Sequence, residues 1–136
     1  MNTATRTQTL AVTLAGIVQA VWIADVAYGM TFAQARPQPR CKLRTEDGRI
    51  VSVSVPANIQ ALTPGDRLTV TVSCIGCAND GIFWASRPRK GIRLSAAAVL
   101  AEAQGLPARV VEIVDRLSTS WEGTHAELVE VARQWA

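Results

Sequence analysis

An alternation of apolar and polar residues through the middle of the chain constrains the fold more than any other feature. The pattern has a period of two, which places successive side chains on opposite faces of a β-strand. Turn-forming residues separate the runs, and Glu46-Asp47-Gly48 is typical of a tight hairpin in which the glycine takes a positive φ. The alternation therefore predicts four short antiparallel strands with one apolar face, over residues 41–44, 51–55, 67–74 and 82–86.

Length and composition agree with one compact unit built around this sheet. The chain has 136 residues, of which 49% are hydrophobic, and this is enough apolar material for a single core. The four predicted strands resemble small curled sheets and partly open barrels of the SH3 or OB type. We assign residues 1–93 to an N-terminal helix plus this small sheet, and residues 94–136 to a helical tail.

An apolar run from Leu10 to Ala24 precedes the sheet and is interrupted only by Thr13 and Gln19. Gly16 and the alanines four and eight residues later would form a small-residue ridge that another backbone can approach closely. A helix that is apolar almost all round is buried against protein or membrane. We therefore expect an α+β fold in which an N-terminal apolar helix packs on the four-stranded sheet.

The same N-terminal run has two other interpretations. Residues 1–35 have the parts of a signal peptide, with Arg6 as the charged start and Ala33-Gln34-Ala35 as a cleavage site, which would make the chain an exported protein. A membrane span needs about 20 apolar residues, and Asp25 ends the run before that length. We favour the buried helix and, with it, a cytoplasmic protein that does not contact membranes.

Two prolines separate this predicted helix from the strands. Pro37 and Pro39 each lack an amide hydrogen and bias the preceding residue toward extended backbone. Residues 36–40 are therefore predicted to be a linker.

The C-terminal part of the chain carries the start and stop signals of helices. Ser95 is a good N-cap for the first helix, and Gly105 is a good C′ residue that ends it. Pro107 opens the second helix. Thr124 and Glu127 have the pattern of a capping box at the start of a third. We therefore predict three helices, over residues 96–104, 107–117 and 124–135.

The first two of these helices resemble a helix-turn-helix motif. Ala101 occupies the helix contact and Gly105 the left-handed turn, and aliphatic residues follow in the second helix at the spacing of the motif. The resemblance implies a DNA-binding regulator in which Arg109 and Arg116 approach the duplex. Two acidic residues on the same helix cancel these charges, so a packed helical hairpin or a protein-binding surface is the interpretation we favour.

Three cysteines raise the question of a metal or redox site. The segment Cys74-Ile75-Gly76-Cys77 has the spacing of a zinc knuckle, to which Cys41 could add a third thiolate and His125 a fourth ligand. A redox pair is expected at the start of a helix, whereas this pair follows a strand. We favour structural thiols that face the core or a turn. Zinc bound by Cys41, Cys74 and Cys77 remains the alternative.

Positive charge is concentrated before the helices. Residues 1–93 carry eleven Lys/Arg against five Asp/Glu, whereas residues 94–136 carry three against six. Phe83 and Trp84 precede a cationic run, and only one of these two rings can be buried on one face of a strand. Single-stranded nucleic acid stacks its bases on such rings while cations follow its phosphates. The predicted contacts for nucleic acid or a partner are Trp84, Arg87, Arg89, Lys90, Arg93, Arg109 and Arg116.

The sequence shows no pattern that would assemble a catalytic centre. His125 is the one histidine, and the sequence contains no glycine-rich phosphate loop, nucleophile elbow or metalloprotease spacing. We therefore predict a small non-enzymatic binding protein with no required cofactor. Its basic half would contact a nucleic-acid-bound protein complex, and its acidic tail would contact protein. Such features are typical of mobile-element proteins that inhibit or remodel a host nucleoprotein machine.

Overall fold

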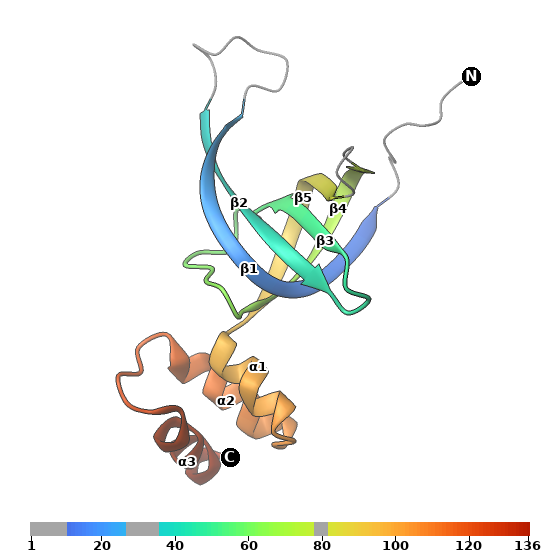
Figure 1. Cartoon of the computed structure of the whole chain (residues 1–136). Helices are drawn as coiled ribbons and strands as arrows, with labels where there is room; N and C mark the ends of the chain where they lie inside the picture. The colour runs from blue at the N-terminus through green and yellow to red at the C-terminus, as the bar shows by residue number, and fades with distance from the viewer. Residues whose placement is uncertain (1–10, 27–35, 78–81) are drawn as a thin grey trace, which may run out of the picture.

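The computed structural model describes residues 11–26, 36–77 and 82–136 (Figure 1). Within these ranges, five strands precede three helices. The strands are β1 (Val12–Val26), β2 (Arg36–Thr45), β3 (Ile50–Ser54), β4 (Arg67–Cys77) and β5 (Phe83–Leu94). The helices are α1 (Ala96–Ala103), α2 (Ala108–Ser118) and α3 (His125–Trp135).

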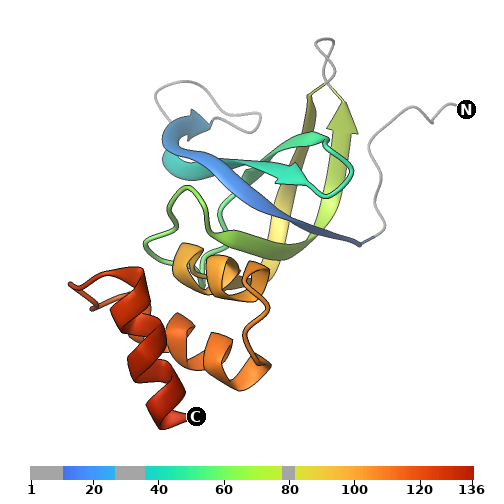
Figure 2. The same ribbon diagram turned by 60° about the horizontal axis from the view of Figure 1, so that its bottom comes forward.

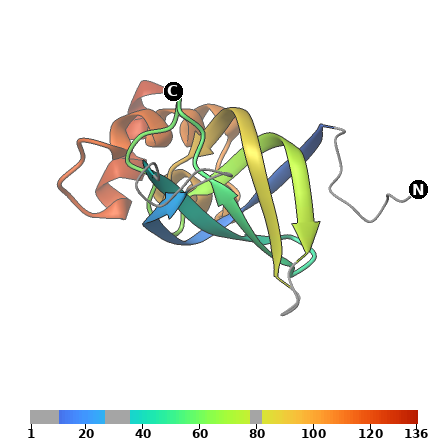
Figure 3. The ribbon, with the colours of Figure 1, turned by 90° about the horizontal axis from the view of Figure 1, so that it is seen from above.

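The five strands close into a barrel in the order β1-β2-β3-β5-β4. The N-terminal part of β1 pairs with β4 and the remainder pairs with β2, which closes the sheet on itself. The contact between β3 and β5 is parallel, and the other four contacts are antiparallel. This strand order contains a Greek key and is similar to that of OB-type barrels, and Figure 3 shows the barrel from above.

The predicted N-terminal helix on a four-stranded sheet is wrong, because residues 12–26 form the 15-residue strand β1. Seven of these 15 residues are β-branched, and such residues favour strands. The apolar run of β1 is as continuous as that of a buried helix. Periodicity alone does not separate these two cases. The sheet therefore has five strands and is mixed rather than antiparallel.

Gly16, which we interpreted as part of a helical ridge, instead marks a place where β1 passes close to β2. A Cβ at this position would lie 2.8 Å from the carbonyl oxygen of Arg44 and 3.1 Å from the Cβ of Leu43. A side chain at position 16 would therefore push the two backbones apart. A β-bulge between Val18 and Ala20 follows, and bulges of this kind bend a strand.

The predicted linker is also wrong, because residues 36–40 belong to β2 and pair with the end of β1. β3 pairs with β2 only from Arg40 onward, so the ends of β1 and β2 form a two-stranded arm that extends beyond the barrel (Figure 1). Pro37 and Pro39 are tolerated there because the second edge of this part of β2 has no strand partner in the described chain. The predicted cleavage site at residues 33–35 lies outside the described residues, but cleavage there would remove β1 from the barrel.

Alternate side chains of the strands fill the barrel. The inward positions of β2, β3 and β4 are those that the period of two predicts, and they are at most 3% exposed. Val18 of β1 and Ala85 of β5 complete this layer. The buried hydrophobic residues of the strands are Val18, Cys41, Leu43, Val51, Val53, Leu68, Val70, Val72 and Ala85.

The three C-terminal helices are present and pack together at one end of the barrel (Figure 2). Three of the predicted end signals have their predicted roles, whereas Pro107 is the N-cap of α2 and not its first residue. The Ser95 hydroxyl caps α1, Gly105 has a φ of 80°, and Thr124 and Glu127 form the capping box of α3. No helix in the described ranges is long and apolar enough to cross a membrane. The second core contains Ala98, Ala101, Val110, Val111, Ile113, Val114, Leu128 and Ala132.

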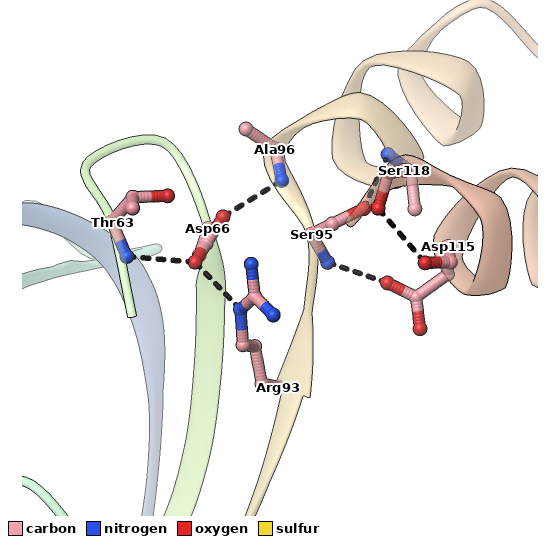
Figure 4. Close-up of polar contacts among 8 residues, drawn as sticks. Thr63, Asp66, Arg93, Ser95, Ala96, Asp115 and Ser118 are labelled. Carbon is pink, nitrogen blue, oxygen red and sulfur yellow. Dashed lines mark hydrogen bonds and ion pairs between the residues drawn. The ribbon is translucent and has the colours of Figure 1, made fainter. Parts of the chain in front are cut away.

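Two aspartates hold the start of α1, Asp115 from α2 and Asp66 from the barrel (Figure 4). The Asp115 carboxylate of α2 accepts a hydrogen bond from the Ser95 amide at 2.7 Å. Asp66, just before β4, is 1% exposed and accepts three hydrogen bonds. Its donors are the amides of Thr63 (2.9 Å) and Ala96 (2.8 Å) and Nε of Arg93 (2.7 Å). We call Asp66 and its three donors the Asp66 clamp.

Candidate nucleic-acid interface

The strand register gathers two tryptophans and two cations on one outer side of the barrel. Trp22 of β1 pairs with Arg40 of β2. Two residues farther along β2, Lys42 pairs with Ser52 of β3, which in turn pairs with Trp84 of β5. Each of the five has at least one neighbour along its strand that is buried or packs against the core, so these five side chains point outward. On β1, Trp22 also adjoins Ile23, which is 66% exposed. We call the five residues the tryptophan face.

The indole of Trp84 lies over the neighbouring strand β4. Gly76 pairs with Trp84, and a Cβ at position 76 would overlap the indole ring. The glycine of the C-x-x-C segment therefore makes room for this ring. Trp84 remains 36% exposed, and so does Trp22. Phe83 instead is partly buried and packs against the barrel core, so the two rings lie on opposite faces of β5, as the alternation predicts.

Arg40 is held in place between the tryptophans. Its guanidinium donates to the Oγ atoms of Ser54 at 2.9 Å and Ser52 at 3.2 Å, and to the carbonyl oxygen of Ala85 at 3.4 Å. The side chain thus extends from β2 across β3 to β5. Because these three acceptors are uncharged, they orient the guanidinium without neutralising it. A phosphate arriving at this face would meet a positioned cation.

The barrel strands are strongly cationic. They contain nine of the 14 Lys/Arg residues of the chain and one of its 11 Asp/Glu residues. That acidic residue, Asp25, belongs to the arm, and β2, β3 and β5 contain none. The charge asymmetry seen in the sequence is therefore concentrated on the sheet that carries the tryptophan face, where it favours polyanions.

The predicted contact residues of β5 are spread along the strand. Trp84 belongs to the tryptophan face. Arg89 and Lys90 are exposed in the middle of β5, where the pairing with β4 shifts register. The side chain of Arg87 lies outside the described part of the structure.

The other predicted cations already have acidic partners. Nε of Arg93 lies 2.7 Å from Oδ2 of Asp66, so this arginine serves the Asp66 clamp. Arg109 and Arg116 lie on α2, and both bond Glu112, at 3.2 and 3.0 Å. The structure therefore places these three arginines away from the tryptophan face.

The structure describes the side chain of one of the three cysteines, Cys41, so the predicted zinc site is not tested. Cys41 is 0% exposed inside the barrel, and burial raises the pKa of its thiol to about 11, which keeps it neutral near pH 7. The backbones of Cys74 and Cys77 belong to β4, but their side chains lie outside the described part. His125 lies on α3 with Nε2 3.2 Å from Oε1 of Gln104. No group of three metal-ligating side chains occurs among the described residues.

Sequence reasoning missed Trp22, Arg40 and Lys42. The signal for the two cations was present, because the alternation that sends Cys41 and Leu43 inward sends their neighbours outward. Trp22 was missed because the N-terminal apolar run was predicted to be a helix. Its neighbour Val21 packs against the core, so the same alternation would have placed it outward once the strand was recognised.

Comparisons with known proteins do not assign a function to the chain. No protein family model matches the chain, and no curated protein is significantly similar to it.

Proposed function

We propose that the chain binds single-stranded nucleic acid on the tryptophan face. The observation that carries the proposal is the placement of Trp22 and Trp84 on either side of Arg40 and Lys42. Bases would stack on the indole rings while the two cations contact phosphates. The outer side of strands β2 and β3 is also where OB-type barrels bind oligonucleotides.

The helix-turn-helix alternative has less support. Four residues of α2 are buried in the helical core, and both arginines of its exposed side bond Glu112. A helix that reads duplex DNA offers cations and amides to phosphates and base edges. Here the cationic side chains of α2 are compensated, whereas Arg40 of the barrel is not.

Fluorescence anisotropy of an end-labelled, mixed-sequence 12-nucleotide strand tests the proposal. Base stacking on an aromatic ring contributes about 1–3 kcal/mol per base, so Trp84→Ala and Trp22→Ala should each weaken binding by about 5- to 150-fold. Lys42→Gln should also lower the slope of log affinity against log salt by about 0.7, the value for one phosphate contact with a single strand.

Two variants in the helices serve as controls. Trp135 on α3 is 63% exposed, so Trp135→Ala removes an exposed tryptophan without touching the barrel. Arg109→Glu reverses a charge at the predicted helix-turn-helix contact. Both should bind the strand as the wild type does. Tight duplex binding that is lost in Arg109→Glu and kept in Trp84→Ala would overturn the proposal in favour of the helix-turn-helix regulator.

A further inference from the structure

A second feature of the barrel is a cavity of about 680 Å³ where β1 passes the turn between β2 and β3. Its floor is apolar and is formed by Leu14, Ile75 and Phe83, which also contact the barrel core. Its rim carries charged side chains, including Arg44. Pockets for small molecules have volumes of about 300–1,000 Å³, and most combine an apolar lining with a few polar groups. The cavity is therefore large enough for one nucleotide.

The rim charges are not equally available to a ligand. Arg49 bonds Asp47 at 3.0 Å and lies over the Phe83 ring, 5.4 Å from its centroid. Arg67 forms two bonds to Glu102, at 2.7 and 3.1 Å. Arg44 is exposed and makes no ion pair or side-chain hydrogen bond with the described residues. Its guanidinium is the rim group best placed to meet an anion.

Arg44 also connects the cavity to the tryptophan face. It lies on β2 two residues beyond Lys42 and four beyond Arg40, so the three cations share the outward side of the strand. We infer that the cavity binds one nucleotide, with the base over the apolar floor and the phosphate at Arg44. This inference rests on the proposed function and adds to it a pocket at the end of the cationic row. The experiment below distinguishes a nucleotide supplied by a bound strand from one that is free in solution.

Filling the cavity tests this inference. Ala15 lines the cavity and is exposed, so Ala15→Phe places a ring in the space without entering the barrel core. Ile92 lies in the same row of the sheet, two strands away, is 69% exposed and does not line the cavity. Ile92→Phe is therefore the matched control. The affinities of both variants and the wild type are measured for the 12-nucleotide strand and, by NMR titration, for the four nucleoside monophosphates.

Ala15→Phe should bind the strand about tenfold more weakly than the wild type and Ile92→Phe. The same loss for the monophosphates shows that the cavity also accepts a free nucleotide, whereas a loss for the strand alone shows that the strand supplies it. Equal strand binding by all three proteins, with no binding of monophosphates, overturns the cavity inference and leaves the tryptophan face standing. If the wild type does not bind the strand but binds the monophosphates, and Ala15→Phe weakens that binding, the result supports the cavity inference and overturns the proposed function. Binding of neither probe overturns both.

Discussion

Removing the Asp66 carboxylate should be among the most destabilising single changes in this chain. Asp66→Ala deletes the acceptor of two backbone amides and of the Arg93 guanidinium, all at a site where Asp66 is 1% exposed. The Thr63 and Ala96 amides would lose their partners. The side chain of Arg93, 23% exposed, would retain a charge with no carboxylate beside it.

The magnitude follows from the nature of these contacts. A hydrogen bond to a charged group contributes about 1.5–3 kcal/mol, and deleting one member of a buried ion pair costs about 3–5 kcal/mol. Because Arg93 keeps some contact with water, we expect the loss of stability to stay near the range for a broken ion pair and not to reach the sum of all three hydrogen bonds. Asp66→Ala should therefore lower the free energy of unfolding by about 3–5 kcal/mol, a large part of the 5–15 kcal/mol typical of a domain.

Urea unfolding, followed by circular dichroism and tryptophan fluorescence, measures this loss as a lower midpoint. Asp47→Ala, which removes an exposed carboxylate paired with Arg49 on the β2–β3 turn, is the control and should leave the midpoint nearly unchanged. A loss below about 1 kcal/mol for Asp66→Ala would refute the reasoning. The same substitution in an Arg93→Met background should cost less, because no unpaired guanidinium remains. Equal costs in both backgrounds would assign the loss to the amides alone.

Two further predictions concern the barrel. Gly16→Ala should lower the free energy of unfolding by about 1–3 kcal/mol, since the new Cβ would meet the Arg44 carbonyl. Thermal unfolding measures this loss of stability, and an unchanged melting temperature would contradict the close approach of β1 and β2. The Cys41 thiol has a pKa of about 11 when folded, against an ordinary 9.0, so its contribution is constant below pH 9 and declines from there to pH 11. The wild type should lose stability relative to Cys41→Ala by up to about 1.4 kcal/mol per pH unit in that window, and parallel pH profiles of the two proteins would show that the thiol is not buried.

The helical tail could be predicted from sequence because its signals are local. Ser95, Gly105 and the Thr124–Glu127 pair each act within one helical turn, and each has the role that its residue type favours. Such caps do not depend on what the helix packs against. The Asp66 clamp, in contrast, joins residues up to 30 positions apart and leaves no comparable local pattern.

The strand β1 could not be identified in the same way. Its residues are apolar on both faces because one side fills the barrel and parts of the other are covered, so the period of two is weak. Small residues in this segment, which suggested a helical ridge, have separate causes in the barrel. Gly16 allows two backbones to approach, and Ala20 follows a bulge. A count of β-branched residues was the available signal, and it favours a strand.

This one misreading also concealed the candidate site. With the run from Leu10 to Ala24 taken as a helix, the predicted sheet is open and no strand pairing places β3 beside β5. Their parallel contact is what brings Ser52 next to Trp84. Pairing of β1 with both β2 and β4 closes the barrel and brings Trp22 beside Arg40. The outward positions of single strands could be predicted from alternation, but the order of the strands depends on closure. The tryptophan face combines residues of four strands, so it can be predicted only when the order of all four strands in the sheet is known.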